Sequence, residues 1–453
     1  MPIIVSGVRQ KAIGVITLIV IFTIIGSLII FKQPPISEHT AYETQVQEIF
    51  EDAKIQFELI RNVTLPSDIT LYICTKQQAI DRWGQEPANS DNNVDNSFLR
   101  QENIYKSLFL MEENESLNDV RADWVAGWTA VTVGHEIYVI YENFWPWDMP
   151  NAEATLIHEL THVWQTRLPT STSYDNEKAQ NALIEGDASY MADCYKTQYN
   201  SNIPVSNSRS SQSFSLNINN YLFSPSHTVV FLSAFSYVQQ LNSVYPNVPD
   251  AVTNLNWFPY IQGKTFVSAI INDSKGSWDR LDQCYTLKYI PVSTAQILHP
   301  NKYFLGETPK NPIAPTLNDN SWTIIPSNYG SSSDTYGEYF IYIMLNHWLN
   351  NDSQAQKVAT GWNGDTFTYY QKDNNFLFTW NITWNSTQDA AEFNKAFTDM
   401  MNLTQAPLKN NNQWITNNRQ LTLIWDPNTT ETIIICCSIT GNQIITTPMV
   451  LIK

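Results

Sequence analysis

Cysteine and histidine are both scarce in this chain of 453 residues, which has five cysteines and seven histidines. The cysteine count is odd and no C-x-x-C pair occurs, which argues against a disulfide framework and against a cysteine-based zinc site. We expect at most one bridge, between Cys194 and Cys284. Because histidine is rare, a patterned pair of histidines carries more information here than in an average chain.

Basic residues are also few, since 26 lysines and arginines stand against 43 aspartates and glutamates, for a formal net charge of −17. Phosphate backbones and anionic lipids repel such a chain, so we expect no nucleic acid partner. Apolar residues make up 43% of the chain, which is enough for a sizeable core. The length favours two or three structural units, and no internal repeat is visible.

One long apolar run, residues 13–31, contains no charged residue. At about 1.5 Å per residue it reaches about 28 Å, enough to cross a bilayer core. Arg9 and Lys11 precede it, which predicts a cytoplasmic segment 1–12, a single-pass signal anchor at 13–31 and the rest of the chain outside the cytoplasm. A cleaved signal peptide is the alternative, although no A-x-A-like cleavage site is visible.

The segment from Leu156 to Trp164 reads L-I-H-E-L-T-H-V-W, an H-E-x-x-H pattern with helical periodicity. In a helix, His158 and His162 lie one turn apart on one face, so both imidazoles can bind a single zinc ion. Glu159 lies between them and can reach a water on that ion as general base. The simpler interpretation is an ordinary helix with two surface histidines.

A catalytic zinc site needs a third protein ligand, and Glu185 offers a carboxylate 23 residues after His162, in the helix-patterned segment A-L-I-E-G-D-A-S-Y. Gly186 inside that helix costs about 1 kcal/mol relative to alanine, and a close approach to the H-E-x-x-H helix would explain it. Three protein ligands leave the fourth zinc position open for water. The simpler interpretation of Glu185 is a solvated helix glutamate.

Both segments resemble the gluzincin zinc metallopeptidases, especially the peptidase-MA-like (thermolysin-like) group. Four later segments are similar to blocks of that group: F-P-Y-I-Q-G-K-T-F-V from Phe258, S-T-A-Q-I-L-H-P-N-K-Y from Ser293, G-W-N-G-D from Gly361 and D-A-A-E-F from Asp389. The resemblance covers residues 125–400. It implies a thermolysin-like catalytic fold with zinc on His158, His162 and Glu185, and with Glu159 as the base.

The resemblance also bears on three further residues. Gluzincins carry a tyrosine a few residues before a helix glycine, where it steadies the oxyanion, and Tyr260 with Gly263 is similar; the alternative is a packed aromatic. His299 either lines the pocket as a further catalytic residue or caps a turn. Asp187 is a candidate for orienting a zinc ligand, although thermolysin-like enzymes place that aspartate where this chain has Ser189.

The pattern along the chain predicts an α+β organisation. Residues 32–39 predict a short stalk, residues 40–310 a zinc metallopeptidase-like domain, and residues 311–453 a strand-rich C-terminal α+β region that is either separate or part of the same unit. The main predicted elements are strands at 69–74 and 136–141, a helix at 337–349, strands at 366–371, 376–384, 421–425, 432–439 and 443–452, and a helix at 388–401.

The sequence therefore predicts a membrane-anchored, extracytoplasmic zinc metallopeptidase that hydrolyses peptide bonds in a peptide or protein substrate. One alternative is a non-catalytic cell-surface protein of the same fold that binds peptides or partners. The intact Glu159 argues against it, because a decayed site would have lost its base. A third interpretation is a surface structural protein with a fortuitous motif, which the absence of zinc would indicate.

Overall fold

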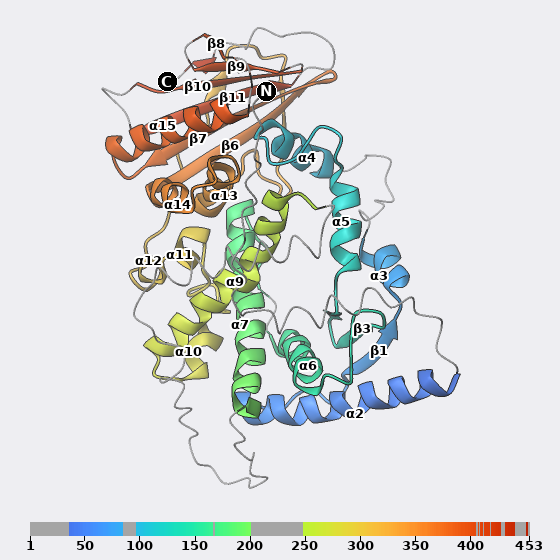
Figure 1. Cartoon of the computed structure of the whole chain (residues 1–453). Coiled ribbons are helices and arrows are strands. Elements are labelled where there is room, and N and C mark those ends of the chain that lie inside the picture. Colours follow the sequence, from blue (N-terminus) through green and yellow to red (C-terminus); the bar gives the residue numbers. More distant parts are fainter. Residues whose placement is uncertain are drawn as a thin grey trace, which may run out of the picture.

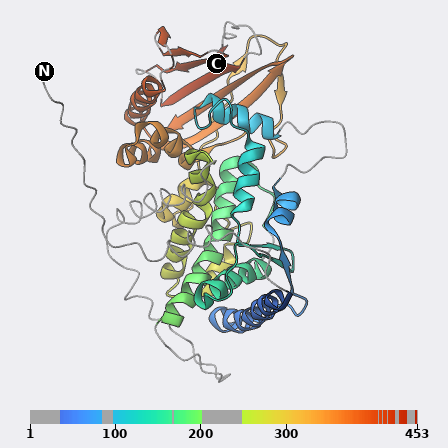
Figure 2. The same cartoon turned by 45° about the vertical axis from the view of Figure 1, so that its right-hand side comes forward.

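The computed structural model describes residues 36–84, 97–165, 168–200 and 248–451, apart from positions 405, 407, 411, 417, 427–430 and 440–449. A large sheet lies at one end of the molecule, a small sheet and a long helix lie toward the other, and further helices connect them (Figures 1 and 2). The H-E-x-x-H pattern lies in the helical part, near the small sheet.

The first described helix, α2 (Ile36–Arg61), packs against α6 (Met149–Trp164). It does so because apolar residues recur every three or four positions and all lie buried on one face: Val46, Ile49, Phe50, Ala53, Phe57 and Ile60. The helix begins at Ile36, inside the segment 32–39 that the sequence predicts as a stalk.

The small sheet has the strand order β1-β3-β2 and consists of β1 (Thr70–Cys74), β2 (Ala130–Val133) and β3 (Glu136–Ile140). β1 pairs with β3 in parallel and β2 pairs with β3 in antiparallel fashion, so β2 is an edge strand. The strands predicted at 69–74 and 136–141 are confirmed as β1 and β3, whereas β2 was not predicted.

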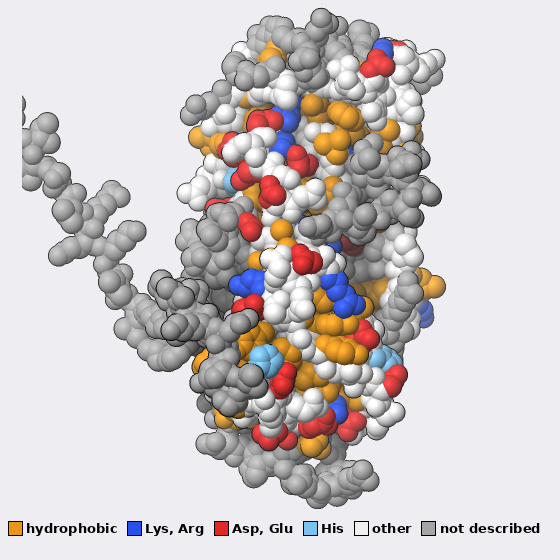
Figure 3. All heavy atoms as spheres, turned by 90° about the vertical axis from the view of Figure 1, so that its right-hand side faces the viewer, with side chains coloured by type: hydrophobic (Ala, Val, Ile, Leu, Met, Phe, Trp, Pro, Cys, Tyr) orange, Lys and Arg blue, Asp and Glu red, His pale blue; other side chains and the backbone are white. Residues whose placement is uncertain are grey.

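Three short helices precede or accompany this sheet: α3 (Lys76–Trp83), α4 (Ser97–Ser107) and α5 (Leu117–Ala126). Apolar side chains gather in patches on the side of the molecule that lies on the right in Figure 1 (Figure 3). In β1, Tyr72 is 42% exposed and stacks on Tyr138 of β3 with ring centroids 5.0 Å apart.

Two long helices, α7 (Tyr174–Asn200) and α9 (Asp250–Asp273), lie side by side in the middle of the molecule. Three short helices follow them: α10 (Trp278–Gln283), α11 (Thr294–Leu298) and α12 (Pro300–Phe304). In Figure 1, α6 lies on the right of the α7–α9 pair and α11 and α12 lie on its left.

The large sheet has the order β5-β6-β7-β11-β10-β9-β8, and its neighbouring strands are antiparallel. Its strands are β5 (Thr323–Ile325), β6 (Trp362–Lys372), β7 (Asn375–Trp384), β8 (Leu408–Asn410), β9 (Gln413–Ile415), β10 (Arg419–Ile424) and β11 (Thr432–Ile439). A two-residue strand β4 (Thr316–Leu317) pairs separately with β12 (Val450–Leu451). Most of the segment predicted as a strand at 443–452 lies outside the described residues.

The helices α13 (Gly337–Leu349), α14 (Asp352–Thr360) and α15 (Thr387–Leu403) lie against this sheet (Figure 1). The helix predicted at 337–349 is confirmed with the same bounds. A single cluster of buried apolar side chains runs from α2 to β11, so the C-terminal region shares a core with the helices that precede it.

The mixed α and β content agrees with the predicted fold class, but the N-terminal transmembrane helix included in that class is not supported and is corrected here. No helix among the described residues is both long enough and apolar enough to cross a membrane. The long helices α2 and α7 each carry several charged residues, which is typical of helices with one face in water. The run at 13–31 itself lies outside the described residues.

The predicted bridge between Cys194 and Cys284 is also wrong, because all five cysteines are free thiols. The Sγ of Cys284 lies 3.2 Å from the hydroxyl oxygen of Tyr303 instead. Burial raises the pKa of the Cys194 thiol to about 12, so the thiol is protonated at neutral pH and is a poor nucleophile. Cys194 therefore serves as a packing residue of α7.

Candidate metal centre

The H-E-x-x-H helix α6 begins with Asp148 as N-cap and Pro150 in the first turn, where proline is favoured. The side chain of Asn151 donates to the Asp148 carboxylate at 2.7 Å. Leu156 and Leu160 are fully buried. Their contacts with the core set the rotation of α6, so that the two histidines of the motif point toward α7.

Three side chains from two helices converge on one point. The Nε2 atoms of His158 and His162 lie 3.1 Å apart, and the Oε2 of Glu185 lies 3.2 Å from the first and 3.4 Å from the second. Ligand atoms about 2.1 Å from a tetrahedral zinc ion are about 3.4 Å apart, so this triangle has nearly the required size. Among the described residues no second group of His, Cys, Asp and Glu side chains brings its ligand atoms together in this way.

The chemistry of these three residues fits a zinc ion. The Oε2 of Glu185 is buried and accepts no hydrogen bond, although it lies against two imidazole nitrogens. A buried carboxylate oxygen without a donor is unfavourable unless a cation lies beside it. Two imidazoles and a carboxylate are a donor set that zinc prefers, and they leave a fourth position open.

The charges of the group favour a bound cation as well. Burial lowers the pKa of His162, but the carboxylate of Glu185 outweighs burial and raises that pKa to about 10. Burial raises the pKa of Glu185, but the neighbouring His162 outweighs it and holds the pKa well below its usual range. Protons and zinc therefore compete for the same lone pairs, and zinc binding must release a proton.

The carboxylate of Glu159 is held by the small sheet. The hydroxyl of Thr132 in β2 donates to the Oε2 of Glu159 at 2.7 Å. Glu159 is only 6% exposed, so this hydrogen bond fixes a carboxylate that has little contact with bulk water. β2 is an edge strand, and among the described residues no strand other than β3 pairs with it.

A contact between two glycines places Glu185. A Cβ on Gly186 would lie 2.3 Å from the carbonyl carbon of Gly263, and a Cβ on Gly263 would lie 2.0 Å from the carbonyl oxygen of Ala182. The backbones of α7 and α9 therefore touch directly beside the proposed ligand. The sequence predicted that Gly186 allows a close approach to the H-E-x-x-H helix, and this is corrected: the partner is α9.

The same crossing of α7 and α9 brings Tyr260 close to His158, His162 and Glu185, which are called the metal group below. Tyr260 lies three residues before Gly263 on α9. Its ring stacks on the imidazole of His158, with centroids 6.2 Å apart and planes inclined by 14°. Trp257 also packs against Tyr260, with ring centroids 5.2 Å apart. The structure thus brings Tyr260 together with the predicted ligands, and its part in catalysis stays a prediction.

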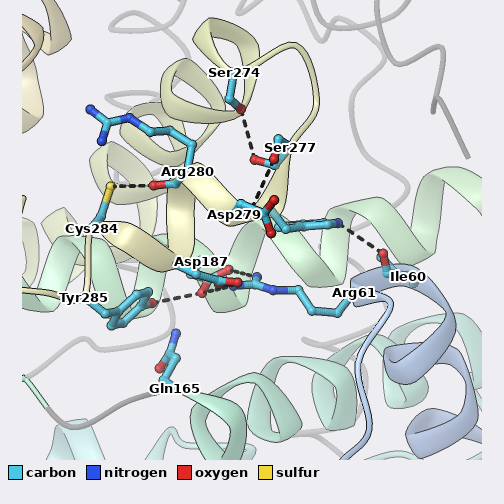
Figure 4. A network of polar contacts seen from close by, with 12 residues as sticks. Ile60, Arg61, Gln165, Asp187, Ser274, Ser277, Asp279, Arg280, Cys284 and Tyr285 are labelled. Atoms are coloured by element: carbon cyan, nitrogen blue, oxygen red, sulfur yellow. Dashed lines mark hydrogen bonds and ion pairs between the residues drawn. The ribbon is translucent and has the colours of Figure 1, made fainter. Parts of the chain in front are cut away.

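Asp187 is bound by another set of partners (Figure 4). Its carboxylate pairs with Arg61 of α2 at 2.5 Å and accepts a hydrogen bond from the hydroxyl of Tyr285 at 2.9 Å. Arg61 also pairs with Asp282 at 2.6 Å. Asp187 therefore does not orient an imidazole, contrary to the expectation. It lies two residues after Glu185 and links α7 to α2 through its ion pair with Arg61.

His299 is not brought to the metal group. Its Nε2 lies 2.6 Å from the Oε1 of the buried Glu338 on α13. It is the N-cap residue of α12, but its side chain makes no capping hydrogen bond. Since α12 lies on the other side of the α7–α9 pair from α6, the structure supports neither the pocket nor the capping role for this histidine (Figure 1).

Two residues beside the metal group were not predicted, Thr132 and Gln165. Gln165 lies 2.9 Å from Nδ1 of His162 through its Oε1, and its Nε2 donates to the carbonyl of Ile184 at 2.8 Å. Its position three residues after His162 is a usable sequence pattern, since residues three apart share a helix face. No pattern in the sequence indicates Thr132.

Comparison with known proteins finds one family model, described as "Domain of unknown function (DUF8575)", which matches residues 326–434. This match covers α13 to α15 and much of the large sheet, but none of the residues of the metal group. No curated protein matches the chain, and no solved structure does. The chain is therefore similar to an uncharacterised family over its C-terminal region, and the resemblance to gluzincins stays a prediction.

Proposed function

We propose that this chain is a zinc-dependent metallopeptidase that hydrolyses peptide bonds. The observation that carries the proposal is the convergence of His158, His162 and Glu185, with Glu159 on the same helix turn. Glu185 comes from a different helix, and its buried oxygen points at both imidazoles without a hydrogen bond. A helix with two incidental surface histidines would not be expected to gather such a third donor.

The proposed chemistry divides among four residues. His158, His162 and Glu185 would hold the zinc ion, which when bound acts as a Lewis acid and lowers the pKa of a water molecule toward about 7. The carboxylate of Glu159 would accept a proton from the attacking water and pass it to the leaving amine.

Two further contacts serve this reaction. The hydroxyl of Tyr260 donates to the oxygen on which negative charge develops. Thr132 keeps the carboxylate of Glu159 oriented, because its hydroxyl donates to the Oε2 atom at 2.7 Å. The edge of β2 gives an extended substrate backbone a place to pair.

The test is the zinc content of the purified full chain, together with cleavage of a peptide library followed by mass spectrometry. We expect one zinc ion per chain and cleavage that a chelator abolishes. Glu159→Gln is the matched control, since this residue is the base and not a ligand: it should retain zinc and lose roughly a hundredfold or more in rate.

The other outcomes separate the alternatives. A chain that binds zinc and cleaves nothing, but retains particular library peptides, would be a peptide-binding protein. A chain without stoichiometric zinc would refute the metal centre altogether. Loss of zinc in Glu159→Gln would show that the base has been misassigned.

A further inference from the structure

Gln165 lies at the C-terminal end of α6 and contacts both helices that carry the metal group. Its Oε1 is 2.9 Å from the Nδ1 of His162, and its Nε2 donates to the backbone carbonyl of Ile184 at 2.8 Å. Ile184 directly precedes Glu185 on α7. One side chain thus joins a ligand of the first helix to the residue beside a ligand of the second.

The carbonyl of Ile184 decides which way the amide of Gln165 points. A carbonyl oxygen only accepts hydrogen bonds, so the amide atom that faces it must be the nitrogen. The Oε1 of Gln165 therefore faces His162. Since this oxygen also only accepts, the Nδ1 of His162 must carry a proton.

This proton determines which ring nitrogen can bind a metal. In a neutral imidazole with the proton on Nδ1, the lone pair is on Nε2. The Nε2 of His162 is the atom that lies 3.1 Å from the Nε2 of His158 and 3.4 Å from the Oε2 of Glu185. The backbone of α7 thereby sets, through one glutamine, the tautomer that His162 needs on α6.

The main chain of α6 holds Gln165 in position for this contact. Gln165 is the C-cap residue, with extended φ and ψ of −61° and 133°, and its backbone N–H donates to the carbonyl of Thr161 at 2.9 Å. The last helical turn is therefore closed by the backbone. The side chain remains available to reach back three residues, where neighbouring side chains share a helix face.

We infer that Gln165 is a positioning residue of the metal centre, which fixes the tautomer of His162 and the register of Glu185 against it. The inference rests on the proposed function and deepens it. Metal-binding histidines usually donate to a carboxylate, a backbone carbonyl or water. An uncharged amide would make the imidazole less basic than a carboxylate would, so a water molecule on a bound zinc ion would be more acidic.

The experiment measures metal binding to the full chain and does not require a substrate. Zinc affinity is determined by competition with a chelator for the wild type, Gln165→Leu, Gln165→Glu and the control Gln180→Leu. Gln180 is a buried glutamine of α7 that bonds to Asn176 and Ser171 at 3.0 and 3.1 Å, so its loss tests the effect of removing a buried amide elsewhere.

We expect Gln165→Leu to bind zinc about 10- to 100-fold more weakly. Gln180→Leu should lose thermal stability and keep its zinc affinity. Gln165→Glu retains the acceptor for His162 and loses the donor to Ile184, so it should bind zinc more tightly than Gln165→Leu. In the cobalt-substituted protein, the pH at which the visible absorption changes should be higher for Gln165→Glu than for the wild type.

Three results would overturn the inference. The first is a folded Gln165→Leu that binds zinc like the wild type. The second is a Gln180→Leu that loses as much affinity as Gln165→Leu, because the effect would then be general destabilisation. If Gln165→Leu does not fold, an unchanged absorption midpoint in Gln165→Glu overturns it. A wild-type chain that binds no zinc is a separate result and refutes the proposed function.

Discussion

Replacing Gly263 by alanine tests the crossing of α7 and α9 on which the metal group depends. The new Cβ would lie 2.0 Å from the carbonyl oxygen of Ala182 and 2.8 Å from its carbonyl carbon. A carbon and an oxygen in contact are about 3.3 Å apart, so the two helices would have to separate locally by about 1.3 Å. Both contacting atoms belong to backbone, and no side-chain rotation can relieve them.

Two opposing effects determine the stability of this variant. Alanine is about 1 kcal/mol better than glycine inside a helix. Overpacking a close contact costs about 1–3 kcal/mol. The net destabilisation is therefore at most about 2 kcal/mol, and the chain should still fold.

We expect Gly263→Ala to lower zinc affinity strongly, although it lowers the stability of the fold only moderately. The distances in a zinc site tolerate deviations of about 0.2 Å, and Glu185 lies directly beside the crossing. We expect zinc affinity to fall at least about tenfold, the lower end of the range for residues that position metal ligands.

The assay is a chelator competition for zinc combined with thermal unfolding of the same samples. Lys264→Ala is the control, because Lys264 is the next residue on α9 and its half-exposed side chain pairs with Asp193 at 2.7 Å. It should change stability by no more than about 0.5 kcal/mol and leave zinc affinity unchanged. A Gly263→Ala protein with the zinc affinity and stability of the wild type would refute the backbone contact of α7 with α9.

Three further predictions concern Glu185, Tyr260 and Asp175. Glu185→Ala should lower zinc affinity strongly in a protein that remains folded, measured by chelator competition and circular dichroism; unchanged affinity would mean that another residue completes the site. Tyr260→Phe should lower kcat by about a hundredfold with little change in substrate affinity, and full activity would make Tyr260 a packing residue. Burial raises the pKa of Asp175 to about 7 in the folded chain, above its unfolded value, despite hydrogen bonds from Thr294 that lower it. Its contribution to stability is therefore complete below about pH 4 and is lost as the pH rises through about 7, so Asp175→Asn should flatten the dependence of unfolding free energy on pH in that window. An unchanged slope in urea titrations across that range would show that Asp175 remains ionised.

The sequence by itself determined the features that depend on neighbours along the chain. The spacing of His158 and His162 puts both on one face of any helix, and Asp148 with Pro150 marks where that helix begins. The bounds of α13 followed from its apolar run in the same way. These are local properties, because helical periodicity and end residues act over a few positions.

Only the tertiary structure decided which distant elements meet. Gly186 was recognised as a residue for close approach, but the choice of α9 over α6 depends on how three helices cross. Asp187 is held by Arg61, which lies 126 positions earlier in the chain, and not by an imidazole. The same applies to Glu159, whose carboxylate is oriented by Thr132 of an edge strand that the sequence did not predict.

For His299, the sequence suggested a place near the metal group that the packing of the helices does not give it. Its segment was similar to a family block, yet its partner is Glu338 on α13, next to the large sheet. The sequence specifies which residues are able to bind a metal, since this depends on side-chain chemistry and helical spacing. Which of them do converge depends on packing between elements far apart in the chain, where shifts of about an ångström decide whether donors meet.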